Sequence, residues 1–382
     1  MRPALEDERR IRAQALVREW TRSGLLDPSQ GAALGEQLRV DVRRTNVFLR
    51  VGLALFTALI ISASVMLIVV GLDLDDAIPS AIVTGISAVA CVALAQHLVA
   101  RRRFYRFGVE EALAVGSVAL MAISAAALTY GQNRSHAGNG PLVAALLVGA
   151  GGGFGIYLRF GYVYAVIGAI ACAAAIPFQL ELTETTERAL AAAALAVALV
   201  AARAKWRQSP DEYPGDDYAL VQAAAWAGLY LTLNLQLTGS RIAGPFYWFT
   251  YAMIWALPLA GLYLGTRHKG RPLLDVSLVM TLVTLLTNKA YLGWPRHEWD
   301  PIVLGVILMA AAIAVRRWLS NGPNGQRAGF TPARILSTDT GAVTMLGTAS
   351  ARFHPDAASF PDPEGGGFDG GRSGGGGASG SY

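Results

Sequence analysis

The sequence predicts an all-α membrane protein: a polytopic bundle of about ten transmembrane helices with a short N-terminal cytoplasmic helical hairpin and a disordered Gly-rich tail. The chain is 53% hydrophobic and only 15% charged, whereas soluble globular domains carry about 25% charged residues. Apolar runs recur from about residue 51 to 319, and basic residues gather at the ends of alternate runs. We therefore divide the chain into a hairpin (1–47), a transmembrane bundle (48–319) and a cytoplasmic tail (320–382).

The N-terminal segment has the pattern of two short helices joined by a turn. The first is expected over Leu5–Ser23 and should end at Gly24, because glycine adopts a left-handed C-cap at little cost. Asp27, Pro28 and Gln30 predict the start of the second helix, since they match an N-cap, a first-turn proline and a capping box. Two short helices bury little core. A self-packed appendage and a docking site for a protein partner or the membrane surface therefore both stay open.

Ten apolar stretches are long enough, or nearly so, to cross a hydrocarbon core of about 30 Å as α-helices. In chain order they are 51–71, 78–99, 111–130, 141–158, 162–180, 187–203, 219–238, 246–265, 273–292 and 301–319. The first of them follows a highly charged segment and exceeds the length of a signal-peptide apolar region. We interpret it as a true span.

The basic residues predict how the spans are oriented, because cytoplasmic loops are enriched in Lys and Arg. Sixteen fall on one side of the ten-span arrangement: Arg43, Arg44, Arg50, Arg101, Arg102, Arg103, Arg106, Arg159, Arg203, Lys205, Arg207, Arg267, Lys269, Arg271, Arg316 and Arg317. Five fall on the other side: Arg134, Arg188, Arg241, Lys289 and Arg296. The asymmetry predicts a multi-pass protein of the cell inner (plasma) membrane with both termini in the cytoplasm.

Glycines are concentrated in the fourth predicted span, between Gly149 and Gly155. A phosphate-binding loop would need a preceding strand and a following helix, which the sequence does not predict. Two glycine pairs at four-residue spacing, Gly149 with Gly153 and Gly151 with Gly155, instead favour close approach of another helix. The alternative is a local helix break that lines a cavity.

The last part of the chain changes composition. One weak hairpin-like stretch occurs around Ile335–Leu346, and the segment from Glu364 onward is dominated by Gly and Ser. Such a segment cannot offset its ordering entropy by burial. We therefore expect a disordered tail.

No sequence motif indicates a catalytic site, a cofactor or a metal. The chain has no His-Glu-x-x-His, Gly-x-Ser-x-Gly or P-loop motif, and its two cysteines, Cys91 and Cys172, fall inside predicted spans. The net charge of +5 is explained by span ends rather than by a nucleic-acid surface. We expect no cofactor, no catalytic residue and no nucleic-acid partner.

One loop does place a histidine beside two carboxylates, at His297, Glu298 and Asp300. Trp294 and Trp299 flank it, as expected of an aromatic interfacial loop. The interfacial loop is the favoured interpretation, and a lipid-modifying enzyme is the alternative.

The ninth predicted span has a polar face, because Ser277, Thr281, Thr284 and Asn288 follow helical spacing. Asn and Lys are costly inside a membrane, so their presence points to function. The two preceding spans add polar and aromatic residues near the same outer leaflet. The candidate solute-binding residues are Asn234, Tyr247, Tyr251, Thr284, Asn288 and Lys289. Interhelical hydrogen bonding with an aromatic belt is the alternative. Paired acidic residues deep in the spans, which would favour ion coupling, are missing.

Trp20-x3-Gly24-Leu25-Leu26, the following Pro28-Ser29-Gln30 and Tyr130-Gly131-Gln132 resemble motifs of a group of uncharacterised bacterial inner-membrane proteins, classed as a domain of unknown function. The resemblance covers about the first 160 residues. It implies a cytoplasmic helical module ahead of a polytopic bundle, and no activity.

The leading functional hypothesis is binding or transport of a small solute or ion through an outer-leaflet polar and aromatic site. The alternative is a membrane scaffold or sensor that recruits partners through the hairpin and the tail. An intramembrane lipid-modifying enzyme comes third.

Overall fold

A computed structural model describes residues 5–22, 24–40, 45, 47–74, 76–104, 107–132, 138–208, 217–240, 242–295, 297–322, 327 and 330. These residues form helices and one isolated β-bridge, between Arg327 and Phe330, and they contain no strand. The predicted disordered tail from residue 331 onward, including Ile335–Leu346, lies outside the described residues.

The helices follow the predicted order along the chain. They are α1 (Leu5–Arg22), α2 (Pro28–Gln37), α3 (Val47–Gly71), α4 (Ala77–Arg102), α5 (Val109–Gln132), α6 (Gly140–Phe160), α7 (Val163–Ala175) with the 3₁₀ helix η1 (Ile176–Gln179), α8 (Glu184–Gln208), α9 (Asp217–Leu233), α10 (Pro245–His268), α11 (Arg271–Tyr291) and α12 (Asp300–Ser320). Each of the ten predicted spans coincides with one helix from α3 to α12. The protein is an all-α integral membrane protein.

Eight of these helices are long and apolar enough to cross a membrane, and two, α7 and α9, are shorter apolar helices. The short length of α7 has a local cause. Pro177 lacks an amide proton and its ring clashes with the preceding turn of an α-helix, so the chain continues from Ile176 as the 3₁₀ turn η1. The second short helix, α9, ends at Leu233 instead of the predicted residue 238. A count of ten crossings stays a prediction.

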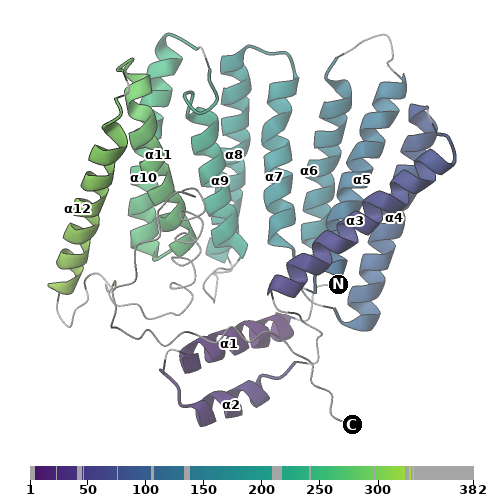
Figure 1. Ribbon diagram of the computed structural model, residues 1–382, viewed down its shortest axis with the longest axis horizontal. Helices are drawn as coiled ribbons and strands as arrows, with labels where there is room; N and C mark the ends of the chain where they lie inside the picture. The colour runs from purple at the N-terminus through teal and green to yellow at the C-terminus, as the bar shows by residue number, and fades with distance from the viewer. Residues whose placement is uncertain are drawn as a thin grey trace, which may run out of the picture.

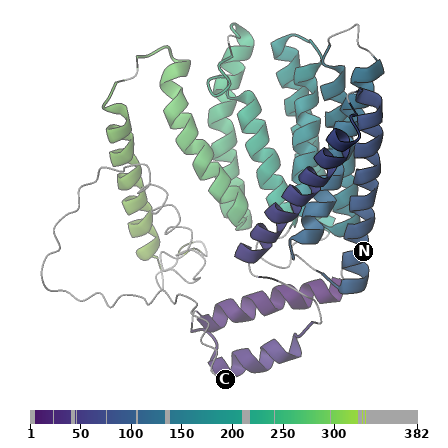
Figure 2. The same cartoon turned by 45° about the vertical axis from the view of Figure 1, so that its right-hand side comes forward.

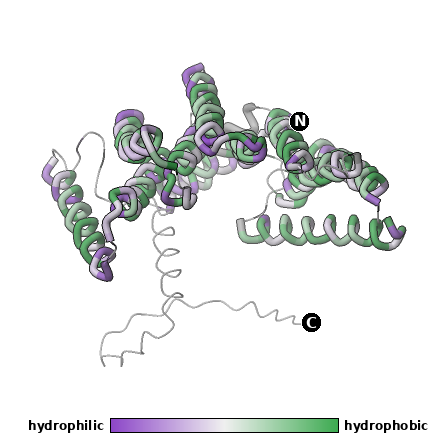
Figure 3. Tube along the Cα trace, turned by 90° about the horizontal axis from the view of Figure 1, so that it is seen from above, coloured by the Kyte–Doolittle hydropathy of each residue, from purple (hydrophilic) through white to green (hydrophobic). Residues whose placement is uncertain are grey.

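The helices from α3 to α12 stand in an elongated row rather than a closed ring (Figure 1). Helices α4 to α9 pack in chain order, and α11 packs against both α9 and α10. Helix α3 crosses the row obliquely against α5, and α12 stands at the opposite side (Figure 2). Viewed from above, hydrophobic residues run along the helices and hydrophilic residues gather mainly near their ends (Figure 3).

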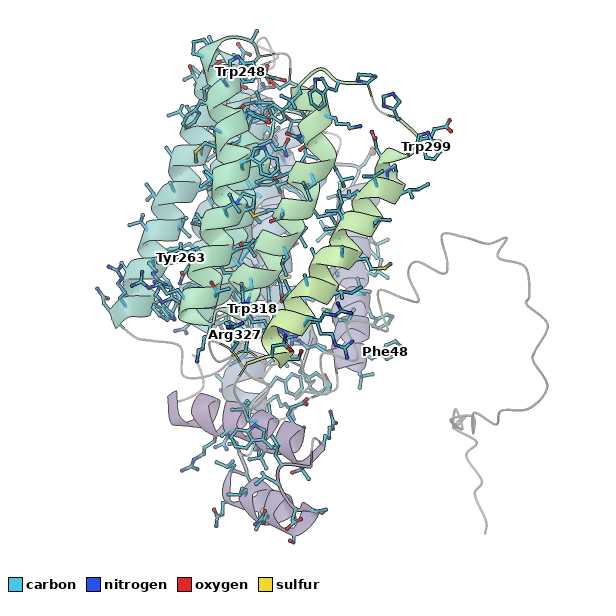
Figure 4. The ribbon with its side chains drawn as sticks, turned by 90° about the vertical axis from the view of Figure 1, so that its left-hand side faces the viewer. Phe48, Trp248, Tyr263, Trp299, Trp318 and Arg327 are labelled. Atoms are coloured by element: carbon cyan, nitrogen blue, oxygen red, sulfur yellow. The ribbon has the colours of Figure 1, made fainter. Side chains whose placement is uncertain are left out.

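Aromatic side chains lie at both ends of the long helices, above and below their apolar middle parts (Figure 4). Trp248 and Trp299 lie at one end, which we call the far end. Phe48, Tyr263 and Trp318 lie at the other, the hairpin end, next to α1 and α2. Basic residues occur in the last turns of α4, α6, α8, α10 and α12. The C-terminus of each of these helices lies at the hairpin end (Figure 1). The basic asymmetry of the sequence is therefore present in the fold.

Two main apolar clusters hold the row together. The first joins α4, α5, α6 and the start of α7 around small residues such as Ala88, Ala95 and Ala114. The second joins α9, α10 and α11 and includes two buried tyrosines, Tyr230 and Tyr291. Helix α12 has no buried residue over its length. The flanking helix therefore contributes little packing to either cluster.

The glycines of α6 confirm one predicted helix contact and correct another. A Cβ atom at Gly149 would lie 3.0 Å from the Cys172 sulfur, and one at Gly153 would lie 2.8 Å from the Ala165 carbonyl oxygen, both on α7. This pair therefore lets α7 approach closely. The second pair, Gly151 and Gly155, has nothing within 4 Å, so its predicted role in close packing is wrong for this chain. Because α6 is one continuous helix, it has no break in this region.

The N-terminal hairpin follows the predicted caps. Gly24 has a φ of +73°, and α2 begins at Pro28, where the Gln30 side-chain oxygen accepts the Asp27 N–H at 3.2 Å. Gln14 of α1 donates a hydrogen bond to the Leu38 carbonyl at 2.8 Å. The two helices are therefore joined by a side-chain contact as well as by their turn.

Replacing Gly153 by Ala should destabilise the protein by about 1–3 kcal/mol, the usual cost of overpacking. The obstacle is the Ala165 carbonyl, which is backbone and cannot rotate away. The matched control is Gly155→Ala on the same helix, which should change the free energy of unfolding by less than about 1 kcal/mol. Unfolding in detergent micelles measures both. Equal losses at the two positions would contradict the α6–α7 contact.

Candidate functional site

The polar face of α11 meets α9 and α10 at the far end. Each of the six candidate residues makes a hydrogen bond or an ion pair with a neighbouring element or side chain there: Asn234, Tyr247, Tyr251, Thr284, Asn288 and Lys289. The structure thus gathers residues that are 55 positions apart in sequence, from 234 to 289.

Thr284 lies at the centre of this group and is fully buried. Its hydroxyl oxygen is 2.8 Å from the Ile254 carbonyl of α10 and 2.9 Å from the Met280 carbonyl of its own helix. Carbonyls only accept, so the hydroxyl donates to one of them. It therefore accepts the bond from the Tyr230 hydroxyl, 2.8 Å away on α9. Through its contacts with Tyr230 and the Ile254 carbonyl, the Thr284 side chain links α9, α10 and α11.

Asn234 extends the chain of hydrogen bonds and is also fully buried. Its Nδ2 is 3.0 Å from the Tyr230 hydroxyl and 3.3 Å from the Thr287 hydroxyl. Tyr230 already donates to Thr284, and Thr287 donates to the Val283 carbonyl at 2.9 Å. Both oxygens can therefore only accept from Asn234, which fixes the amide group with its NH2 facing them.

The opposite side of the Asn234 amide is left without a partner. Among the described residues, its Oδ1 is one of only two buried side-chain oxygen or nitrogen atoms that make no hydrogen bond. A buried acceptor without a donor costs about 1–3 kcal/mol. Such an atom in a native structure calls for an explanation, and a bound water, ion or ligand is one.

Three tyrosine rings lie beside the amides. The Tyr291 ring centroid is 5.1 Å from that of Tyr247 and 5.5 Å from that of Tyr251. The Tyr251 hydroxyl donates to Asn288 Oδ1 at 2.9 Å, and the Tyr247 hydroxyl donates to the Tyr291 carbonyl at 2.8 Å. Gln236 donates in turn to the Tyr247 hydroxyl at 3.3 Å. The α10 and α11 faces are thus bonded together.

The position of Asn234 corrects the sequence prediction, which placed it inside a span. It follows the last residue of α9 and opens a turn. Arg188 of α8, only 4% exposed, explains why the helix ends there. Its guanidinium donates to the Thr232 carbonyl at 2.9 Å, to the Thr238 hydroxyl at 2.7 Å and to Glu184 at 3.0 Å. The arginine therefore satisfies a terminal carbonyl of α9 that another helical turn would otherwise use.

A second contact fixes the same turn. The Leu235 N–H donates to the Tyr291 hydroxyl at 2.7 Å. Backbone amides just past a helix end need such partners when they are buried. The turn is therefore tied to both α8 and α11.

Lys289 joins α11 to α12. Its Nζ lies 2.5 Å from Asp300 Oδ1, while Asp300 Oδ2 accepts the His297 N–H at 3.0 Å. His297 and Glu298 are exposed. The described residues contain no group of three or more His, Cys, Asp or Glu side chains suited to a metal ion.

Sequence reasoning missed four residues of the site: Tyr230, Thr287, Tyr291 and Arg188. Thr287 and Tyr291 lie three and seven positions after Thr284, on the same helical face, so a wider reading of that face would have found them. Tyr230 and Arg188 gave no signal, because their partners belong to other helices. Comparison with protein-family models, with curated proteins and with solved structures finds no match to this chain.

Replacing Tyr230 by Phe should lower the free energy of unfolding by about 1–3 kcal/mol, since it leaves a buried Asn234 N–H without an acceptor. The control is Tyr263→Phe at the exposed hairpin end, where the hydroxyl bonds only to Arg267 at 3.1 Å. The control should cost less than about 0.5 kcal/mol. Equilibrium unfolding in detergent measures the difference, and matching losses would argue against a buried network.

Proposed function

We propose that this integral membrane protein binds a small solute or ion at the far end, between α9, α10 and α11, and moves it across the bilayer. The observation that carries the proposal is the Asn234 Oδ1 atom, fully buried and without a donor among the described residues. The surrounding hydroxyls and amides are otherwise satisfied. A ligand that binds this oxygen would therefore add a contact without breaking any of the existing hydrogen bonds.

The chemistry of that atom defines the ligand class. An amide oxygen accepts hydrogen bonds and coordinates cations, and it repels anions. Tyrosine faces add attraction for a cation. Arg188, the buried cation that the described part of the chain places nearby, is already bonded to Glu184 and to the α9 turn. These features favour a small cation or a neutral solute with O–H or N–H donors.

Entry to the site requires a movement, because Thr284 and Asn234 are fully buried. Helix α12 is the element best suited to move. It has no buried residue, and the Lys289–Asp300 pair ties it to α11. An ion pair whose side chains are 35% and 29% exposed is worth about 1 kcal/mol or less, so opening it costs little.

Orientation and location belong to the same proposal. The hairpin end faces the cytoplasm of a bacterial inner membrane, with both termini on that side and the far end outside. The one-sided distribution of basic residues supports this. The resemblance to uncharacterised inner-membrane proteins with an N-terminal helical module stays a prediction.

A scaffold or sensor is the second candidate function. The hairpin leaves Trp20 40% exposed and Leu25 60% exposed at the hairpin end, outside the apolar helices. Large apolar side chains on a soluble surface are typical of protein-binding sites. In this function the hairpin would recruit a protein partner and the far-end network would serve only packing.

Cysteine labelling separates the two functions. In a background without Cys91 and Cys172, Asn288→Cys and Thr284→Cys should both react with a small water-soluble thiol reagent, because solute access requires the network to open. Met280→Cys is the matched control, buried on the same helix but apolar, and it should stay unreactive. If neither Asn288→Cys nor Thr284→Cys reacts with the reagent, the scaffold function is favoured.

Binding itself is measured by thermal unfolding with sodium, potassium, ammonium and a panel of neutral sugars and amino acids. A ligand at 100 times its Kd should stabilise the protein by about 2.7 kcal/mol. Asn234→Leu should abolish that shift, and Gln236→Leu, which alters the rim, should retain most of it. A shift that survives Asn234→Leu would place the ligand elsewhere.

The orientation is checked in intact cells with an impermeant thiol reagent. Glu298→Cys, exposed at the far end, should be labelled, whereas Arg102→Cys and Lys269→Cys should not. Labelling at position 102 or 269 would overturn the proposed orientation.

A further inference from the structure

A second polar cluster lies at the hairpin end, where α3 meets the start of α5. The Arg50 guanidinium of α3 binds the Glu111 carboxylate of α5 through two hydrogen bonds, of 2.6 Å from Nε and 2.5 Å from Nη2. The Glu111 side chain is only 8% exposed. Two parallel charge-assisted bonds of this kind are strong and hold the two groups in a fixed geometry.

Backbone contacts bring the two segments close enough for that pair. Gly108, with a φ of +107°, precedes α5, and a Cβ atom there would lie 2.3 Å from the Arg50 carbonyl oxygen. The Thr45 hydroxyl also donates to the Phe107 carbonyl at 3.3 Å. The start of α3 is therefore pressed against the segment before α5.

Glu110, beside Glu111, is the unexpected member of this cluster. It is fully buried. Its Oε1 accepts the Phe107 N–H at 2.7 Å. Its Oε2 makes no hydrogen bond and is the second such buried atom among the described residues. Two buried acidic residues, Glu110 and Glu111, therefore lie side by side in the first turn of α5, at the helix end rather than deep in the span.

No described side chain donates a hydrogen bond to Glu110 Oε2. Arg50 and Tyr164 lie in electrostatic range of Glu110, and Arg50 makes its two hydrogen bonds to Glu111. On the helices packed against α5, the arginines that end α4 and α6 are exposed. Arg106, four residues earlier, lies outside the described residues. The helix N-terminus favours a carboxylate slightly, but full burial opposes it more strongly.

We propose that Glu110 is a proton-binding site. In the folded protein at neutral pH its carboxylate takes up one proton from water on Oε2 and becomes a neutral carboxylic acid, and at high pH it returns that proton to water. The neutral acid removes the uncompensated buried charge. Glu110 ionises only when Arg50 is shared between two carboxylates or when the cluster opens to water. This proposal is independent of a solute site at the far end.

The site has a direct structural consequence. An ionised Glu110 places a second negative charge next to Glu111 and competes for Arg50, whose ion pair with Glu111 joins α3 to α5. Proton release therefore loosens the attachment of α3, and proton uptake tightens it.

Infrared difference spectroscopy of the full-length protein in lipid nanodiscs tests the site. Between neutral and high pH, the wild type should lose a carboxylic-acid C=O band that shifts in D₂O. Glu110→Gln, which mimics the neutral acid and keeps the fold, should lack that band. Glu298→Gln, at an exposed glutamate far from this cluster, is the control and should retain the band. A wild-type spectrum without any band removed by Glu110→Gln would overturn the proposal.

Two further arms distinguish the remaining outcomes. Because the folded state binds a proton that the unfolded state releases, the stability of the wild type should fall as pH rises, and that of Glu110→Gln should fall less. Equal pH dependence would contradict the site. Adding sodium or potassium chloride at constant pH, against choline chloride, should leave the band unchanged. Loss of the band with a metal cation would identify a metal-ion site and overturn proton binding.

Discussion

A polar group inside a bilayer has no water to bond with, so the protein itself must supply every partner. The hydrogen-bond chain from Asn234 through Tyr230 to Thr284 is the clearest result of this constraint, because it ties α9, α10 and α11 together where apolar packing alone does not distinguish one neighbour from another. Lipid tails are as apolar as leucine, so apolar contact gives little preference for a helix over lipid. The polar chain supplies that preference.

The helices in the two halves of the row are held together by different kinds of contact. From α4 to α7 the helices approach through small residues, as at Gly153 against Ala165, and close contact supplies the attraction. From α9 to α11 the helices bury larger side chains such as Tyr230 and Tyr291 and are joined by hydrogen bonds, with buried Arg188 of α8 at one side. In each half one polar oxygen is left over, on Glu110 and on Asn234. The two leftover oxygens lie in the segments to which we assign function.

The sequence predicted the order and approximate positions of the helices because twenty-residue apolar runs leave few alternatives in a membrane. It placed the end of α9 wrongly, since Arg188 and Tyr291 act on that turn from distant positions and apolar content alone continues to residue 238. The polar face of the ninth predicted span and the polar and aromatic residues of the two spans before it predicted six residues of the far-end cluster. Tyr230 was not among them, because its contacts depend on what faces it. Glu110 falls just before the predicted span 111–130, and its burial depends on the crossing of α3, which the sequence does not show.

The crossing of α3 also bears on how the protein is made. Arg50 and Glu111 are 61 residues apart, and at about 5–20 residues per second the chain needs roughly 3 to 12 seconds to reach the second after the first. During that interval Arg50 lacks its Glu111 partner, and its long side chain can reach the membrane surface. Helix α3 is the most apolar of the eight long helices, so it can hold its place in the bilayer alone. The apolar window of α3 is also 0% buried in the finished fold, so lipid rather than protein is its main surrounding at both stages.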